Sequence, residues 1–189
     1  VIAAETGAMV SRSGRVKMRT RLNAPRGAGF FALVSAFVVA LIRKLVGGES
    51  FLINDFSAEA GGEVLLAPTF SGGIAHRRLA GERLLLTRGA FLAAAGNLDL
   101  KMRWGGLRGL FAREGLFFLE VSGTGDLFYT SYGGTEDILV DGKWVVDNGH
   151  LVAFDPALDF TIRSAGGGML GFLASGEGLV CEFSGKGSV

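Results

Sequence analysis

One pattern occurs twice in this chain and decides its expected fold. It first runs as Gly89-Ala90-Phe91-Leu92-Ala93-Ala94, followed by Leu98-Asp99-Leu100-Lys101-Met102-Arg103. It returns as Gly149-His150-Leu151-Val152-Ala153-Phe154, followed by Leu158-Asp159-Phe160-Thr161-Ile162-Arg163, with the same internal spacing. Near the start, Gly7-Ala8-Met9-Val10 and Val16-Lys17-Met18-Arg19 match it at lower fidelity. Self-similarity at a fixed period indicates a repeat architecture.

The second half of the unit repeats as well. Runs that begin with Gly48, Glu114 and Glu177 lead to the evenly spaced closing glycines Gly61, Gly123 and Gly185. Each unit consists of short apolar runs bounded by glycine, a pattern typical of antiparallel strands. Because a unit of this size cannot bury its own apolar face, we expect three units to share a core around a pseudo-threefold axis.

These observations predict a single all-β domain over residues 1–189. Its repeats are expected at 1–84, 85–144 and 145–189, with an insertion at 24–45 in the first repeat. The interval from Gly7 to Gly89 is longer than that from Gly89 to Gly149, and an apolar run at 30–42 accounts for the surplus. Its length and its flanking residues favour a short helix.

The predicted helix is too short to cross a membrane alone, since a span needs about 20 apolar residues. Two interpretations stay open. The helix could fill the core of the domain, or it could lie in a membrane interface or against a partner. In the second interpretation the candidate contact residues are Phe30, Phe31, Phe37, Val38, Leu41, Arg43 and Lys44.

The composition indicates a folded protein without a bulk-charge preference for a partner. Apolar residues make up 49% of the chain and charged residues 20%, while the net charge is +1. That apolar content suggests a homo-oligomer interface or contact with a membrane. The stretch from Val1 to Arg26 is locally basic, with six Lys and Arg against Glu5. We therefore count an anionic membrane surface among the candidate partners.

The single cysteine, Cys181, excludes a cysteine-based zinc site and a C-x-x-C redox pair. It lies in a strand-like run, where a small buried thiol is expected. A chain without a cysteine pair suits a reducing compartment, and the first residues show no signal-peptide pattern. We expect a cytoplasmic protein, which the apolar segment could hold at the inner face of the membrane.

The sequence offers no catalytic constellation. The nucleophile elbow, the phosphate-binding loop and the dinucleotide fingerprint are all absent. His76 and His150 have no ligating residue at helical spacing, so we expect neither a metal nor another cofactor. A non-enzymatic protein is therefore predicted.

Basic residues on strands are the remaining candidates for a site. Alignment of the repeats places Arg19, Arg103 and Arg163 at one position, where a pseudo-threefold axis would gather them into an anion-binding ring. The alternative is that they are solvated strand faces whose aliphatic stems cover apolar surface. Nucleic acid is not an expected partner, because the phenylalanines fall within apolar runs and not in an exposed stacking pattern.

Several motifs together resemble a known family. They are Gly7-Ala8-Met9-Val10, Gly48-Glu49-Ser50-Phe51, Leu66-Ala67-Pro68, Gly89-Ala90-Phe91-Leu92-Ala93, Gly123-Thr124-Gly125 and Val146-Asp147-Asn148-Gly149-His150-Leu151-Val152-Ala153-Phe154. In this order they resemble the "altered inheritance of mitochondria" protein 24 family. The resemblance implies β-sandwich units like those of the tryptophan RNA-binding attenuation protein (TRAP-like) with pseudo-threefold symmetry. It also implies that mitochondrial relatives associate with the inner membrane, and it brings no catalytic residues.

Two functions are carried forward. The first is a non-enzymatic scaffold or membrane-associated organising protein, motivated by the apolar segment beside basic residues. The alternative is a soluble binding module for a small anionic ligand or an oligonucleotide, using the arginine position.

Overall fold

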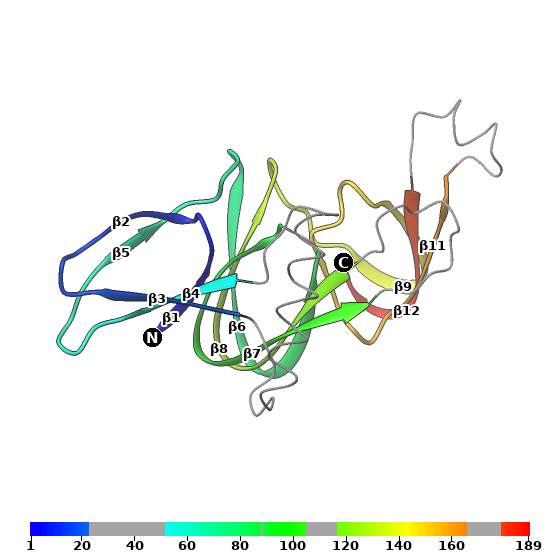
Figure 1. Cartoon of the computed structure of the whole chain (residues 1–189). Helices are drawn as coiled ribbons and strands as arrows, with labels where there is room; N and C mark the ends of the chain where they lie inside the picture. Colours follow the sequence, from blue (N-terminus) through cyan, green and yellow to red (C-terminus); the bar gives the residue numbers. More distant parts are fainter. Residues whose placement is uncertain (23–51, 88, 105–116, 166–178) are drawn as a thin grey trace.

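The computed structural model describes residues 1–22, 52–87, 89–104, 117–165 and 179–189. Every helix or strand assigned within these ranges is a β-strand, so the all-β prediction is confirmed (Figure 1). The predicted helical insertion at 24–45, with every contact residue proposed on it, lies outside the described residues. No described segment forms a helix long and apolar enough to span a membrane.

The strands follow one another along the chain with short connections, apart from three longer segments outside the described ranges. They are β1 (Ile2–Glu5), β2 (Met9–Arg12), β3 (Lys17–Leu22), β4 (Leu52–Ser57), β5 (Val64–Leu66), β6 (Gly73–Leu86), β7 (Phe91–Trp104), β8 (Phe117–Ser131), β9 (Leu139–Asp147), β10 (Ala153–Phe154), β11 (Asp159–Ser164) and β12 (Leu179–Ser188).

The strands form antiparallel sheets of seven, three and two strands. The orders are β10-β6-β8-β7-β1-β4-β3, β11-β12-β9 and β2-β5. Within them the order β1-β4-β3 recurs as β6-β8-β7 and as β9-β12-β11. In each of these triplets the strand latest in sequence lies in the middle and pairs with both others. Each part of the chain therefore builds a small sheet with the same strand order.

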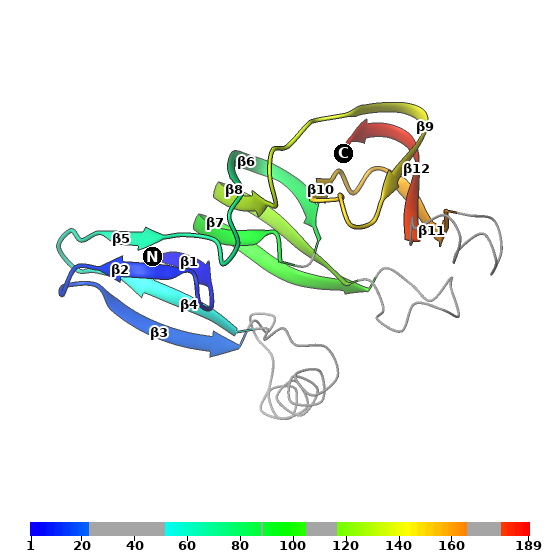
Figure 2. The same ribbon diagram turned by 90° about the horizontal axis from the view of Figure 1, so that it is seen from above.

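The expected closure about a pseudo-threefold axis is not found. Figures 1 and 2 place β2 and β5 at one end of the molecule and β9, β11 and β12 at the other. The reason lies in the pairing between triplets: β7 pairs with β1 and β10 pairs with β6, but among the described strands β2 and β9, which would complete the ring, do not pair with each other. The described triplets thus follow one another in a row.

The triplets are also offset from the predicted repeats. Strand β6, which the prediction placed almost entirely in the first repeat, pairs with β8 and belongs to the second triplet. The predicted boundary after residue 144 falls inside β9. The glycine motifs mark the start of the second strand of each unit and not the first, which explains the offset.

Three hydrophobic clusters hold the sheets together, and each comes mostly from one part of the chain. The second triplet supplies most of the central cluster, which includes Leu79, Val121 and Leu127, while Val152 and Ala153 of the third unit pack against it. The N-terminal cluster takes Leu92 and Ala93 from β7, and the C-terminal cluster takes Leu85 and Phe118. These borrowed residues join neighbouring units, so the units are not independent of one another.

Candidate functional site

Each triplet carries one carboxylate at the same place on its middle strand. Asp55, Glu120 and Glu182 are each followed by a buried apolar residue and then by a serine. In register they lie opposite Arg19, Lys101 and Thr161 on the neighbouring strand. The three positions are therefore equivalent in the pairing of the strands as well as in sequence.

An arginine pairs diagonally with each of these carboxylates. The Nε atoms of Arg21, Arg103 and Arg163 lie 2.7, 2.9 and 2.9 Å from carboxylate oxygens of Asp55, Glu120 and Glu182. Arg103 also donates through Nη2 to the second oxygen of Glu120 at 3.0 Å. This two-point contact is the stronger geometry for an arginine with a carboxylate.

The register corrects the alignment that grouped Arg19 with Arg103 and Arg163. Arg19 lies opposite Asp55, whereas Arg21, two residues further along, takes the diagonal position that Arg103 and Arg163 occupy in their own sheets. Alternate residues of a strand share a face, so the sequence pattern could not distinguish the two arginines.

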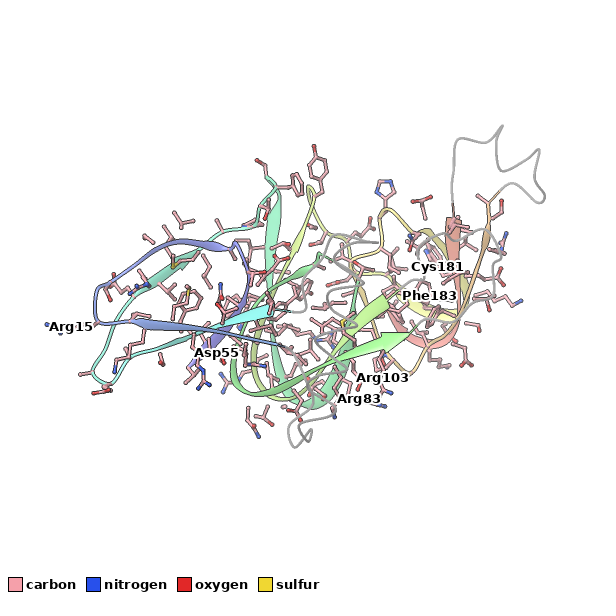
Figure 3. All side chains as sticks on the ribbon, in the orientation of Figure 1. Arg15, Asp55, Arg83, Arg103, Cys181 and Phe183 are labelled. Atoms are coloured by element: carbon pink, nitrogen blue, oxygen red, sulfur yellow. The ribbon has the colours of Figure 1, made fainter. Side chains whose placement is uncertain are left out.

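A second cation approaches two of the carboxylates from the other neighbouring strand. Arg83 on β6 lies 4.0 Å from Glu120, and Lys143 on β9 lies 3.5 Å from Glu182. Arg83 and Arg103 lie close together in Figure 3. Each of these two carboxylates thus links all three strands of its triplet.

The electrostatics of these links are those of a structural contact. Hydrogen bonds from Arg163 and then Lys143 hold the pKa of Glu182 below its ordinary value. The hydrogen bond to Glu120 raises the pKa of Arg103. The Glu120 side chain is only 7% exposed, and a carboxylate that deep needs paired cations. The links therefore fix strand register, although the exposed pairs add little stability.

These ion pairs bear on the predicted anion-binding ring. The guanidinium groups of Arg103 and Arg163 are directed at internal carboxylates. Arg103 lies in the seven-stranded sheet and Arg163 in the three-stranded sheet. Anion binding at these residues stays a prediction, and the internal pairing argues against it.

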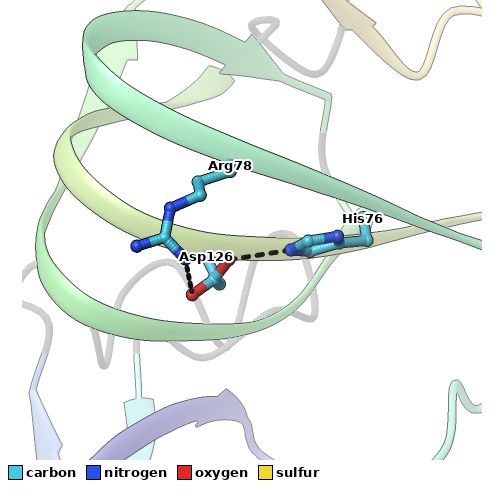
Figure 4. A network of polar contacts seen from close by, with 3 residues as sticks. All are labelled: His76, Arg78 and Asp126. Atoms are coloured by element: carbon cyan, nitrogen blue, oxygen red, sulfur yellow. Dashed lines mark hydrogen bonds and ion pairs between the residues drawn. The ribbon is translucent and has the colours of Figure 1, made fainter.

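A histidine–aspartate contact is the polar cluster that sequence reasoning missed. His76 Nε2 lies 2.9 Å from Asp126 Oδ1, and Arg78 Nη1 lies 3.3 Å from Asp126 Oδ2 (Figure 4). The imidazole also stacks on Phe128, with ring centroids 4.9 Å apart. The alternation of His76 and Arg78 on one strand face is visible in the sequence, but their partner lies on β8, far along the chain, and only the strand register identifies it.

This cluster is a link between β6 and β8. Asp126 on β8 contacts both His76 and Arg78 of β6 through its carboxylate oxygens. In the described ranges no group of three or more His, Cys, Asp or Glu side chains could hold a metal ion.

Cys181 is buried in the C-terminal cluster, as predicted. Desolvation, followed by the negative charge of Asp147, raises the pKa of its thiol from 9.0 to about 11. Because the thiolate is the reactive form, a thiol that stays protonated reacts slowly. Its place beside Phe183 in the core (Figure 3) makes it a packing residue.

The raised pKa of Cys181 predicts a loss of stability in alkaline solution. Above pH 9.0 the thiol ionises in the unfolded chain but stays protonated in the folded one until about 11. The free energy of unfolding should therefore fall between these values. Urea unfolding of the native chain and of a Cys181→Ala variant on both sides of pH 9.0 measures this difference; equal slopes with pH would contradict it.

Comparison with known proteins agrees with the fold. A family model described as Mitochondrial biogenesis AIM24 matches residues 1–189. An uncharacterised protein of Streptococcus pyogenes serotype M6 is 34% identical over 188 residues, which cover 98% of this chain and 73% of that protein. A crystal structure of a Streptococcus pyogenes protein, 33% identical, superposes with a TM-score of 0.76 over 99% of this chain and 80% of that chain.

Proposed function

The chain belongs to the Mitochondrial biogenesis AIM24 family, and on this premise we propose that it is a non-enzymatic scaffold that associates with an anionic membrane surface. The observation that carries the scaffold role is the repeated triplet of strands, each joined across its middle strand by an internal carboxylate. These charged groups hold strands together. A framework built in this way suits presentation of surfaces better than chemistry on a substrate.

The membrane part of the proposal rests on the sequence between β3 and β4. Residues 30–42 contain one polar side chain, Ser35, and Arg43 and Lys44 follow directly. On the described side of this segment, β3 carries Lys17, Arg19 and Arg21 at alternating positions. Lys17 is paired with Glu59 and Arg21 with Asp55, so these two can offer headgroups only part of their charge. Cations attract anionic headgroups while apolar side chains enter the boundary of the acyl chains, so the combination suits a peripheral contact.

A vesicle flotation experiment tests this role. The full chain should float with vesicles that contain anionic lipid, and less so with neutral vesicles or at high salt, because exposed charges are then screened. A variant with Phe30, Phe31 and Phe37 changed to serine should lose most of the bound fraction. The matched control is Phe70→Ser, which removes another phenylalanine, 74% exposed, outside the segment.

Two outcomes would overturn the membrane role. One is no flotation of the native chain with anionic vesicles. The other is binding that survives the triple substitution or deletion of residues 28–42. If binding persists and inorganic phosphate competes for it, the soluble anion-binding alternative becomes the better account, and Arg83→Ala and Lys143→Ala are the variants to examine. Those residues supply the second cation beside Glu120 and Glu182.

A further inference from the structure

The two junctions between neighbouring triplets use the same strand pairing. At the first, Ala3 of β1 lies opposite Ala94 of β7. At the second, Leu85 of β6 lies opposite Phe154 of β10. Ala94 and Phe154 are equivalent in the sequence repeat, because each closes the run that begins at Gly89 or Gly149. Ala3 and Leu85 are equivalent too, since they lie opposite the middle-strand carboxylates of their triplets. Each junction therefore joins equivalent residues.

Strand β9 is the first strand of its triplet, as β1 and β6 are of theirs. Its Val145 lies opposite Glu182, as Ala3 and Leu85 lie opposite the corresponding carboxylates. In the described ranges β9 is hydrogen-bonded to β12 on one edge and to no strand on the other. The edge that accepts a neighbour in β1 and β6 is thus open in β9.

Strand β2 corresponds, in the first unit, to the start of β7 and to β10, the two strands that pair with a neighbouring triplet. β2 pairs with β5 in the same way as the start of β7 pairs with the end of β8. The register shifts at the equivalent place in both pairs, between Met9 and Ser11 in β2 and between Phe91 and Ala93 in β7. The start of β7 then also pairs with β1. For β2, the described residues supply no second partner strand. Among the described strands, β9 therefore has one edge without a partner, and β2 has no second partner strand.

Strands β9 and β2 both expose apolar side chains whose counterparts in the other units are buried. Leu85 of β6 is 8% exposed, whereas its counterpart Val145 in β9 is 47% exposed. Leu92 of β7 is 3% exposed, whereas its counterpart Val10 in β2 is 59% exposed. An open strand edge with apolar side chains is a template for pairing with another chain.

The charges of the two ends differ. The described residues of the N-terminal end, 1–22 and 52–66, carry five basic and four acidic residues. Those of the C-terminal end, 136–165 and 179–189, carry three basic and seven acidic residues. Opposite charges on two surfaces steer them together and oppose pairing of like ends. The two ends lie at opposite extremes of one molecule (Figures 1 and 2), so the N-terminal end of one copy, with its slight excess of basic residues, suits the acidic C-terminal end of another better than two C-terminal ends suit each other.

We propose that β2 of one copy adds as an antiparallel strand to the free edge of β9 in a second copy. The internal junctions supply the register: Arg12, the counterpart of Ala94 and Phe154, lies opposite Val145, and Ser11 lies opposite Val146. The contact joins different surfaces head to tail, so its repetition gives a ring or a filament. It extends the proposed scaffold but needs no membrane, and it is tested without lipid.

Site-specific crosslinking tests the register. Arg12→Cys and Val145→Cys are made on separate chains, both with Cys181→Ala, and mixed with a short maleimide crosslinker. A crosslinked species of two chains is expected from the mixture and not from either variant alone. Leu139→Cys in place of Val145→Cys is the matched control, because Leu139 is 85% exposed but lies at the other end of β9. If Cys181→Ala perturbs folding, the native background serves, since Cys181 is buried.

Sedimentation tests the association itself. The native chain of 19.8 kDa should form larger species that dissociate on dilution or in salt. Val10→Lys and Val145→Lys should each abolish them without loss of fold, since both side chains are exposed in a single copy; Phe70→Lys should not. A native chain that stays monomeric at every concentration overturns the proposal. So does a chain carrying both Arg12→Cys and Val145→Cys that crosslinks only within itself, which would show closure of one chain.

Discussion

A Gly125→Ala variant should lose the cooperative unfolding transition of the native chain, or retain it with stability reduced by about 3 kcal/mol or more. Gly125 lies on β8, opposite Gly96 of β7. A Cβ atom there would come within 2.2 Å of the carbonyl oxygen of Ala95 and 3.1 Å of Leu98 Cγ. The oxygen belongs to the backbone of a paired strand, so it cannot swing aside.

The effect should spread because β8 is central. It pairs with β6 on one side and with β7 on the other, and β6 and β7 connect the second triplet to its neighbours. Thermal and urea unfolding followed by circular dichroism measure the change. Gly134→Ala is the matched control, since a Cβ there meets no atom within 4 Å. A Gly125→Ala chain as stable as this control would show that the two strands separate more easily than their close approach implies.

Phe183→Ala should destabilise the chain by about 3–5 kcal/mol, the range for deleting a buried aromatic side chain. Phe183 is fully buried on β12 (Figure 3), with its ring centroid 5.1 Å from that of Phe154 and 6.2 Å from that of Phe160. Phe118 meets both of these rings edge-on. Removal of Phe183 leaves a cavity among side chains fixed by other strands, so the site can collapse only in part.

The loss of the Phe183 ring should weaken packing between the second and third units as well as packing within the third unit. The C-terminal cluster contains Leu85 and Phe118, which belong to the second triplet. Hydrogen exchange should therefore show reduced protection in β9 and β12, and in the paired ends of β6 and β10. Phe70→Ala, at an exposed phenylalanine, is the control and should change stability little. Protection reduced only in β12 would mean that the cluster does not couple the units.

Much of this fold follows from local pattern. Glycine-bounded apolar runs predicted antiparallel strands, and the run around Cys181 predicted a buried thiol; both are confirmed. The motif order predicted the family, which is also confirmed. These features depend on alternation and spacing, which each segment of sequence carries by itself.

The candidate site shows where such reasoning stops. Arg19 and Arg21 lie on one face of the same strand. Which of the two forms the diagonal pair with Asp55 depends on the register between strands that are distant in sequence. His76 meets its carboxylate in Asp126 through the same kind of pairing. The apolar segment at 30–42 stays a prediction from sequence alone.

By itself, the sequence determined the strand content and the family. It also indicated that the units would need one another, because none can bury its own apolar face. Only the tertiary structure decided that the described units stand in a row, with β2 and β9 at opposite ends and no second partner for either among the described strands, where a closed threefold arrangement had been expected. The reason is physical: alternation places a side chain on a face, whereas the choice of neighbouring strand depends on long-range hydrogen bonds and packing that no local segment encodes.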